Sequence, residues 1–149
     1  MATHELRTEI EIAAPAGRVW SILTDFGAYP QWNPFIVSLE GELHHGAPLV
    51  ARMRPPGSSS AMTFKPRVTV LEPGKRFSWV GSLPIPGLFG GEHGFELIEL
   101  GADRVRFVHG ERFRGVLVSL LRKTLDGGTR SGFIAMNDAL KARAEARPG

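Results

Sequence analysis

Residues 91–113 read GEHGFELIELGADRVRFVHGERF, and the alternation of residue types predicts two neighbouring β-strands. At 92–97, glutamate or glycine alternates with histidine, phenylalanine and leucine. At 104–113, arginines take even positions while valine, phenylalanine and histidine take odd ones, so the odd positions face inward. The triplet 101–103 (GAD) predicts a three-residue hairpin loop, in which facing residues have numbers that sum to 204.

This register places His93 opposite Glu111 on the inner face of the hairpin, and Phe95 opposite His109. Facing residues have Cβ atoms about 4.5–5.5 Å apart, close enough for an imidazole–carboxylate hydrogen bond. A slip of one residue would turn the arginines inward, so the alternation itself opposes it. Because burying such a pair costs several kcal/mol of desolvation per ion, it is either a polar anchor for a ligand or a mutually satisfied structural pair. His109 alone is expected to be structural.

On both sides of this hairpin, the sequence predicts further strands and helices separated by turn residues. Alternation at 6–12 predicts a first strand, Pro15 begins a short amphipathic helix that Gly27 ends, and a second helical turn at 29–32 stops at Pro34. Further strands, separated by turn signals, are expected near 35–43, 48–54, 61–71, 76–82, 91–100 and 104–113. Inward-facing positions in the first four of these are Phe35, Val37, Leu39, Leu49, Ala51, Met53, Met62, Phe64, Val68, Val70, Phe77 and Trp79.

Apolar residues recur every three or four positions from 117 to 144, which predicts a long C-terminal helix. Gly127 and Gly128 interrupt it, each costing about 1 kcal/mol relative to alanine, so a bend or a closely approached backbone is expected there. The predicted fold is therefore α+β, with a seven-stranded curved antiparallel sheet around the C-terminal helix and two short helices after strand 1. One helix cannot fill the concave face, so an internal cavity is expected.

The composition narrows the possible functions. The 149 residues are 42% hydrophobic and suit one domain over 1–149. The absence of cysteine excludes thiol catalysis, cysteine zinc sites and disulfides. A net charge of +3, with no dense basic block, gives little support for nucleic-acid binding. We expect no metal site, no cofactor and no transmembrane segment or signal peptide, hence a cytoplasmic protein, as a monomer or homodimer.

Five segments carry a resemblance to a known family: 14–20 (APAGRVW), 25–35 (DFGAYPQWNPF), 91–95 (GEHGF), 111–115 (ERFRG) and 136–141 (MNDALK). With the order of elements, they resemble the START-like (SRPBCC) superfamily of polyketide cyclases and lipid-transfer proteins. The resemblance covers almost the whole chain and implies a helix-grip fold around a hydrophobic pocket. It implies function only as a class, because such relatives bind or transform very different ligands.

The first functional hypothesis is binding of a small hydrophobic or aromatic ligand, lipid-like or polyketide-like, in the internal cavity. The candidate ligand-binding residues are His93, Glu111, Phe95, Phe107, His109, Trp32, Phe35, Trp79, Phe133 and Asn137. Most of the apolar residues are expected to be ordinary core, because pockets and cores share the same composition. The second hypothesis is a polyketide aromatase or cyclase in which His93 moves protons and Glu111 orients it. The third is a regulatory or stress-response module that acts through another protein and has an occluded interior.

The segment 83–90 (LPIPGLFG) carries four large apolar residues between two strands, which is unusual for a loop. We expect Leu83, Ile85, Leu88 and Phe89 to form a lid over the pocket mouth. Packing against the first helices, or contact with a membrane or a partner, are the alternatives.

Overall fold

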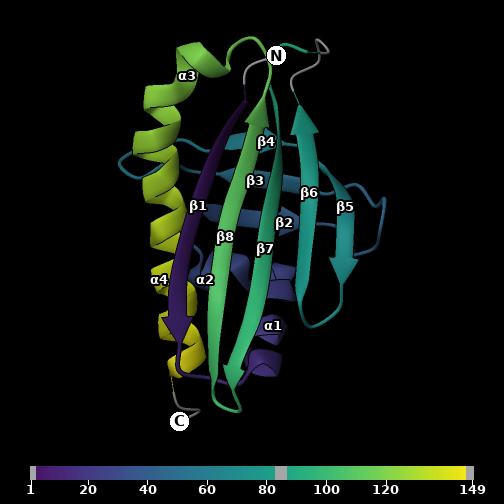
Figure 1. Ribbon diagram of the computed structural model, residues 1–149, viewed down its shortest axis with the longest axis vertical. Helices are drawn as coiled ribbons and strands as arrows, with labels where there is room; N and C mark the ends of the chain where they lie inside the picture. The colour runs from purple at the N-terminus through teal and green to yellow at the C-terminus, as the bar shows by residue number, and fades with distance from the viewer. Residues whose placement is uncertain (1–2, 83–86, 147–149) are drawn as a thin grey trace.

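The computed structural model describes residues 3–82 and 87–146 (Figure 1). Its elements follow the predicted order, with the first strand and two short helices before a run of strands and a long C-terminal helix. They are β1 (Thr3–Ile12), α1 (Ala16–Thr24), the 3₁₀ turn η1 (Phe26–Ala28), α2 (Tyr29–Trp32), β2 (Ile36–Glu40), β3 (Val50–Met53), β4 (Met62–Phe64), β5 (Arg67–Glu72), β6 (Arg76–Ser82), β7 (Gly90–Gly101), β8 (Arg104–Arg114), α3 (Val118–Thr124), the π-helical turn η2 (Leu125–Thr129) and α4 (Arg130–Glu145).

The described strands number eight and form two sheets, where the sequence predicted one sheet of seven. The larger has the order β1-β8-β7-β6-β5 and the smaller β2-β3-β4. Figure 1 shows β2, β3 and β4 crossing behind the long strands, with the C-terminal helix along one side. The strand predicted at 61–71 is divided between β4 and β5. Pro66 lies at the break, and proline has no N–H for the ladder.

Outside the turn, β7 and β8 pair in the predicted register. Glu99 pairs with Val105 and His93 with Glu111, so their numbers sum to 204. The loop itself differs from the prediction, because Gly101 pairs with Arg104 and the register shifts between Glu99 and Gly101. The extra residue is taken up as a bulge, which leaves the strand register unchanged.

Two further register shifts correct the predicted inward set. The β2–β3 register shifts between Ile36 and Ser38, and Ile36 is fully buried where Val37 was expected to be. The β5–β6 register shifts between Val68 and Val70, after which Val70 lines a groove on the outer face of the large sheet. An extra residue reverses the inside–outside alternation of all residues beyond it. A simple two-residue repeat cannot anticipate this reversal.

The C-terminal helix is continuous through the π turn, so Gly127 and Gly128 do not break it. The expected close approach to their backbone is wrong, since nothing lies within 4 Å of where a Cβ would stand on either. Gly132 is the closely approached glycine, because a Cβ there would overlap the ring of Phe35. The helix therefore meets the residue just before β2 at Gly132.

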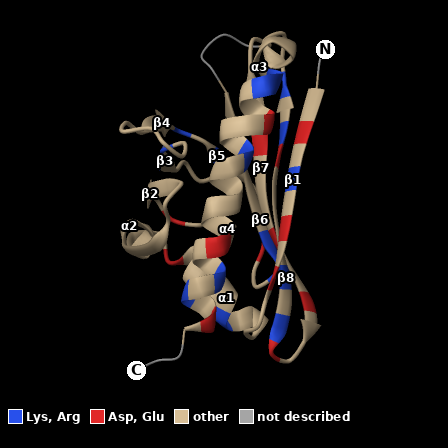
Figure 2. Ribbon diagram, turned by 90° about the vertical axis from the view of Figure 1, so that its left-hand side faces the viewer, with Lys and Arg blue, Asp and Glu red and all other residues tan. Residues whose placement is uncertain are grey.

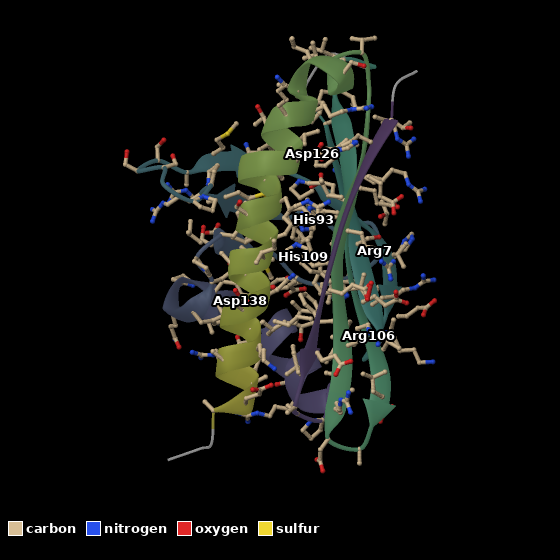
Figure 3. The ribbon with its side chains drawn as sticks, turned by 60° about the vertical axis from the view of Figure 1, so that its left-hand side comes forward. Arg7, His93, Arg106, His109, Asp126 and Asp138 are labelled. Atoms are coloured by element: carbon tan, nitrogen blue, oxygen red, sulfur yellow. The ribbon has the colours of Figure 1, made fainter. Side chains whose placement is uncertain are left out.

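The large sheet has an apolar inner face and a charged outer face. Figure 2 shows lysine, arginine, aspartate and glutamate along β1 and β8, and in Figure 3 Arg7 and Arg106 point away from the helix. Glu11 on β1 forms an ion pair with Arg104 on β8 at 2.6 Å. This polarity sets which side of the sheet can hold an apolar ligand. No helix in the described part of the chain is both long and apolar enough to span a membrane.

Candidate functional site

The site is organised around Glu111 on β8, whose side chain is 18% exposed. Its Oε1 lies 3.2 Å from Nδ1 of His93, which is 1% exposed. The geometry is that of an ion pair and not of a hydrogen bond, and Nδ1 makes no hydrogen bond to any residue that the structure describes. The carboxylate lies over Gly91, where a Cβ would overlap Oε2. Glycine at this position therefore leaves room for the carboxylate.

His93 is hydrogen-bonded on its other side to His109, with 2.7 Å between the two Nε2 atoms. Figure 3 shows both imidazoles in the interior between the C-terminal helix and the large sheet. From His109 the chain of contacts continues through Nδ1 to Oδ1 of Asn137 at 2.9 Å. Nδ2 of Asn137 donates to Oγ1 of Thr8, and Oγ1 donates to the backbone carbonyl of His109, both at 2.8 Å. Strands β1, β7 and β8 and helix α4 thus share one buried polar network.

Aromatic rings enclose the two imidazoles. The ring of Phe133 stacks on His109 at 4.1 Å between centroids and an interplanar angle of 8°. Trp79 and Phe95 lie 5.0 Å and 4.8 Å from His93. Burial in this apolar setting, with a smaller effect of His93, lowers the pKa of His109 well below its usual value. His109 is therefore neutral at physiological pH.

An apolar pocket of about 180 Å³ lies next to Glu111, between the two sheets and the π turn. It is lined by Phe35, Met53, Pro55, Met62, Phe64, Pro66, Trp79, Gly81, Ser82, Phe89, Gly90, Gly91, Glu111, Phe113, Leu125 and Thr129. Among these described residues, Glu111 is the side chain that can ionise. A ligand in the pocket would meet one carboxylate within otherwise mostly apolar walls.

The structure distributes the ten candidate residues over three places. Phe35, Trp79 and Glu111 line the pocket. Trp32 is half-buried and packs on Tyr29 at 5.2 Å. The other candidates are buried outside the pocket lining, in the core or the polar network: His93, Phe95, Phe107, His109, Phe133 and Asn137. The ionisable group that lines the pocket is thus on Glu111, and Nδ1 of His93 lies 3.2 Å from its Oε1.

Several lining residues were absent from the candidate set. Strand alternation predicts Met53, Met62 and Phe64 to face inward, but only as core. For Met62 and Phe64 the prediction of a buried core position is wrong, since they are 59% and 37% exposed at the edge of the pocket. Leu125 belongs to the apolar repeat that predicted the C-terminal helix, but not to the candidate site. Thr129 carried no signal, because it is polar and lies at the end of a π turn that the repeat does not predict. These five place one wall of the pocket on β3, β4 and η2.

The expected lid is only partly within the described residues, since Leu83 and Ile85 lie outside them. Phe89 lines the pocket and stacks on Phe113 at 5.7 Å. Leu88 is half-buried, and its carbonyl accepts a hydrogen bond from the N–H of Leu117 at 3.0 Å. A Cβ at Gly115, which has φ +129°, would overlap the backbone at Leu88 and Phe89. This glycine lets residues 87–89 lie against the start of the C-terminal helix.

A second hollow, of about 240 Å³, lies on the outer face of the large sheet. It occurs where Gly94 pairs with Gly110, so that no side chains cover the backbone. Positively charged arginines and negatively charged glutamates border it. Within residues 3–82 and 87–146, no cluster of three or more His, Asp or Glu side chains is arranged to hold a metal ion.

Comparison with known proteins gives a match over almost the whole chain. A family model described as "Polyketide cyclase / dehydrase and lipid transport" matches residues 3–145. No curated protein matches. Among solved structures, the Zhui aromatase/cyclase from Streptomyces sp. R1128 is 19% identical with a TM-score of 0.77, covering 97% of this chain and 94% of that one. Norcoclaurine synthase from Thalictrum flavum is 15% identical with a TM-score of 0.73, covering 99% and 90%.

A START superfamily protein from Mycobacterium smegmatis is 23% identical, with a TM-score of 0.72, and the alignment covers 95% of this chain and 97% of that one. At these identities the likeness to solved structures establishes the helix-grip fold and nothing finer.

Proposed function

This chain belongs to the polyketide cyclase/dehydrase and lipid transport family, and we propose that it binds a small, flat, apolar ligand with one polar substituent in the pocket beside Glu111. The observation that carries the proposal is an apolar pocket of about 180 Å³ with one ionisable side chain in its described lining. Apolar walls give a ligand contact area, and one fixed polar group gives it an orientation.

The size of the pocket limits the ligand. A closed apolar cavity of about 150 Å³ holds a benzene molecule, so 180 Å³ suits one or two fused rings or the end of a longer chain. Phe35, Trp79 and Phe113 supply aromatic faces on which a flat ring can pack. These features favour an aromatic or polyketide-like ligand over a fully enclosed lipid.

The proposal is tested with 2-naphthol, whose hydroxyl can donate to Glu111, and with naphthalene, which has no hydroxyl. We expect both to bind, as measured by calorimetry and by the change in tryptophan fluorescence, to which Trp79 in the pocket lining contributes. Glu111→Gln replaces a charge-assisted hydrogen bond with a neutral one, roughly half as strong. We therefore expect about threefold to tenfold weaker binding of 2-naphthol and unchanged binding of naphthalene.

The matched control is Glu96→Gln, the same change on the outer face of the sheet. It should leave both affinities unchanged. Failure of either probe to bind up to its solubility limit, or equal losses for both probes in Glu111→Gln, would refute the proposal.

A second candidate function is enzymatic proton transfer, favoured by the position of His93 Nδ1 beside the Glu111 carboxylate. Ring closure and dehydration of polyketides need positioning and proton transfer, not a nucleophile. Because Glu111 lines the pocket and His93 lies behind it, the geometry favours Glu111 as the group that meets the ligand, the reverse of the roles expected from sequence. Solvent deuterium incorporation into 2-tetralone, followed by NMR, tests it. Equal rates in wild type and Glu111→Gln would remove this candidate.

A further inference from the structure

In the buried network, each hydrogen bond has one possible donor and one possible acceptor, and the backbone carbonyl of His109 determines which group donates. The carbonyl oxygen of His109 can only accept a hydrogen bond, so the hydroxyl of Thr8, 2.8 Å away, must donate to it. That uses the one hydrogen of the hydroxyl. The group of Asn137 that contacts Thr8 must then be its NH₂, as the distance of 2.8 Å from Nδ2 to Oγ1 requires.

The orientation of Asn137 next determines the tautomer of His109. With its NH₂ directed to Thr8, Asn137 turns its oxygen toward Nδ1 of His109 at 2.9 Å. Nδ1 therefore carries the hydrogen. Since burial keeps His109 neutral by lowering its pKa, its Nε2 has a lone pair and can only accept.

The tautomer of His109 in turn determines which nitrogen of His93 carries a hydrogen. Its Nε2 lies 2.7 Å from Nε2 of His109 and must donate, so it carries a hydrogen. The remaining nitrogen, Nδ1, lies 3.2 Å from Oε1 of Glu111. Nδ1 has no hydrogen-bond partner among the described residues, so the chain of hydrogen bonds leaves it directed at the carboxylate.

We infer that Thr8, Asn137 and His109 form a one-way hydrogen-bond chain that fixes the tautomer of His93, with Nε2 as the donor to His109 and Nδ1 directed at Glu111. Proton transfer beyond His109 would require reversal of the whole chain, leaving the buried carbonyl of His109 without its donor. The four side chains that the hydrogen bonds link are each 7% exposed or less, so water cannot easily replace any of the hydrogen-bond partners.

This assigns distinct roles to residues that sequence reasoning had grouped together. Glu111 is the group that meets the ligand, whereas His93, His109, Asn137 and Thr8 are positioning residues. The inference deepens the proposed function and rests on it only in taking Glu111 as the contact with the ligand.

The test is the ¹⁵N–¹H NMR spectrum of the histidine side chains in the ligand-free protein. We expect one tautomer of His109, protonated at Nδ1, and a protonated Nε2 on His93. Thr8→Val keeps the shape of the side chain and removes the hydroxyl, so His109 should lose its single tautomer. Thr8→Ser should restore it. The control is Thr24→Val, which removes a threonine hydroxyl that donates to the carbonyl of Trp20 at 2.8 Å on α1.

A wild-type spectrum with His109 protonated at Nε2 would overturn the inference, and so would a Thr8→Val spectrum identical to that of wild type. If Thr8→Val fails to fold, the wild-type spectrum decides alone. Because the measurement uses no ligand, its failure leaves the binding proposal intact. Conversely, absent binding of 2-naphthol with the expected tautomers would refute only the binding proposal.

Discussion

Alanine at position 91 should displace the Glu111 carboxylate without removing it. A Cβ on Gly91 would overlap Oε2 and lie 3.1 Å from Cδ, so the carboxylate must move by about 1 Å to regain van der Waals contact. That distance is enough to break a hydrogen bond from a ligand hydroxyl. A hydrogen bond to a charged group contributes about 1.5–3 kcal/mol, so Gly91→Ala should bind 2-naphthol about tenfold to a hundredfold more weakly.

Stability should change little in this variant. Glu111 is partly exposed and flexible at its end, and alanine in place of a glycine with ordinary backbone angles stabilises by about 0.4–1 kcal/mol through the unfolded chain. The control is Gly94→Ala on the same strand, where the new Cβ would meet Ser78 Cβ at an ordinary 3.7 Å. Both variants should unfold in urea within about 1 kcal/mol of wild type.

Calorimetry with 2-naphthol and naphthalene gives the readout. Unchanged affinity for 2-naphthol in Gly91→Ala would refute the role of the carboxylate, and an equal loss for naphthalene would mean that the methyl group simply blocks the pocket. Combining Gly91→Ala with Glu111→Gln should lose little more than Gly91→Ala alone, because both changes remove the same contact.

Two further predictions concern His109 and the segment before β7. Since burial lowers the pKa of His109, the native state binds fewer protons than the unfolded chain below pH 6.5, and stability should fall by about 1.3 kcal/mol between pH 7 and 5.5. In urea unfolding, this loss of stability between pH 7 and 5.5 should be smaller in His109→Gln than in wild type. An equal loss in both would contradict the lowered pKa of His109. Phe89 lines the pocket and stacks on Phe113, so Phe89→Ser should speed both association and dissociation of 2-naphthol in stopped-flow fluorescence. Unchanged rates would remove the lid role.

The alternation in β7 and β8 was enough to predict their pairing, because a slip would bury arginines. The opposition of His93 and Glu111 followed from it and is confirmed. Alternation alone does not predict the orientation of each side chain within its face of the sheet. His93 turns Nε2 to His109, a diagonal neighbour, and only Nδ1 toward Glu111. A contact between diagonal residues depends on side-chain rotamers, which a binary pattern does not encode.

The second sheet and the pocket wall were harder to predict, for reasons that are local. Pro66 ends one strand and begins another within a run that alternates convincingly. The bulges next to Val37 and Val70 change the facing side without any change in residue type. Asn137 was singled out as an amide on an apolar helix face, but its partner Thr8 lies on β1, 129 positions away in sequence. Contacts of this range come from the fold and not from spacing.

The π turn at Leu125–Thr129 holds one residue more than a regular α-helical turn. An α-helix turns by about 100° per residue, and the wider π turn absorbs most of the rotation that this extra residue would otherwise impose on α3 relative to α4. Deleting Gly127 or Gly128 should therefore restore a regular α-helix and keep Leu125 near the pocket wall. The same deletion within the regular α-helical part of α4 would rotate every helical residue before it.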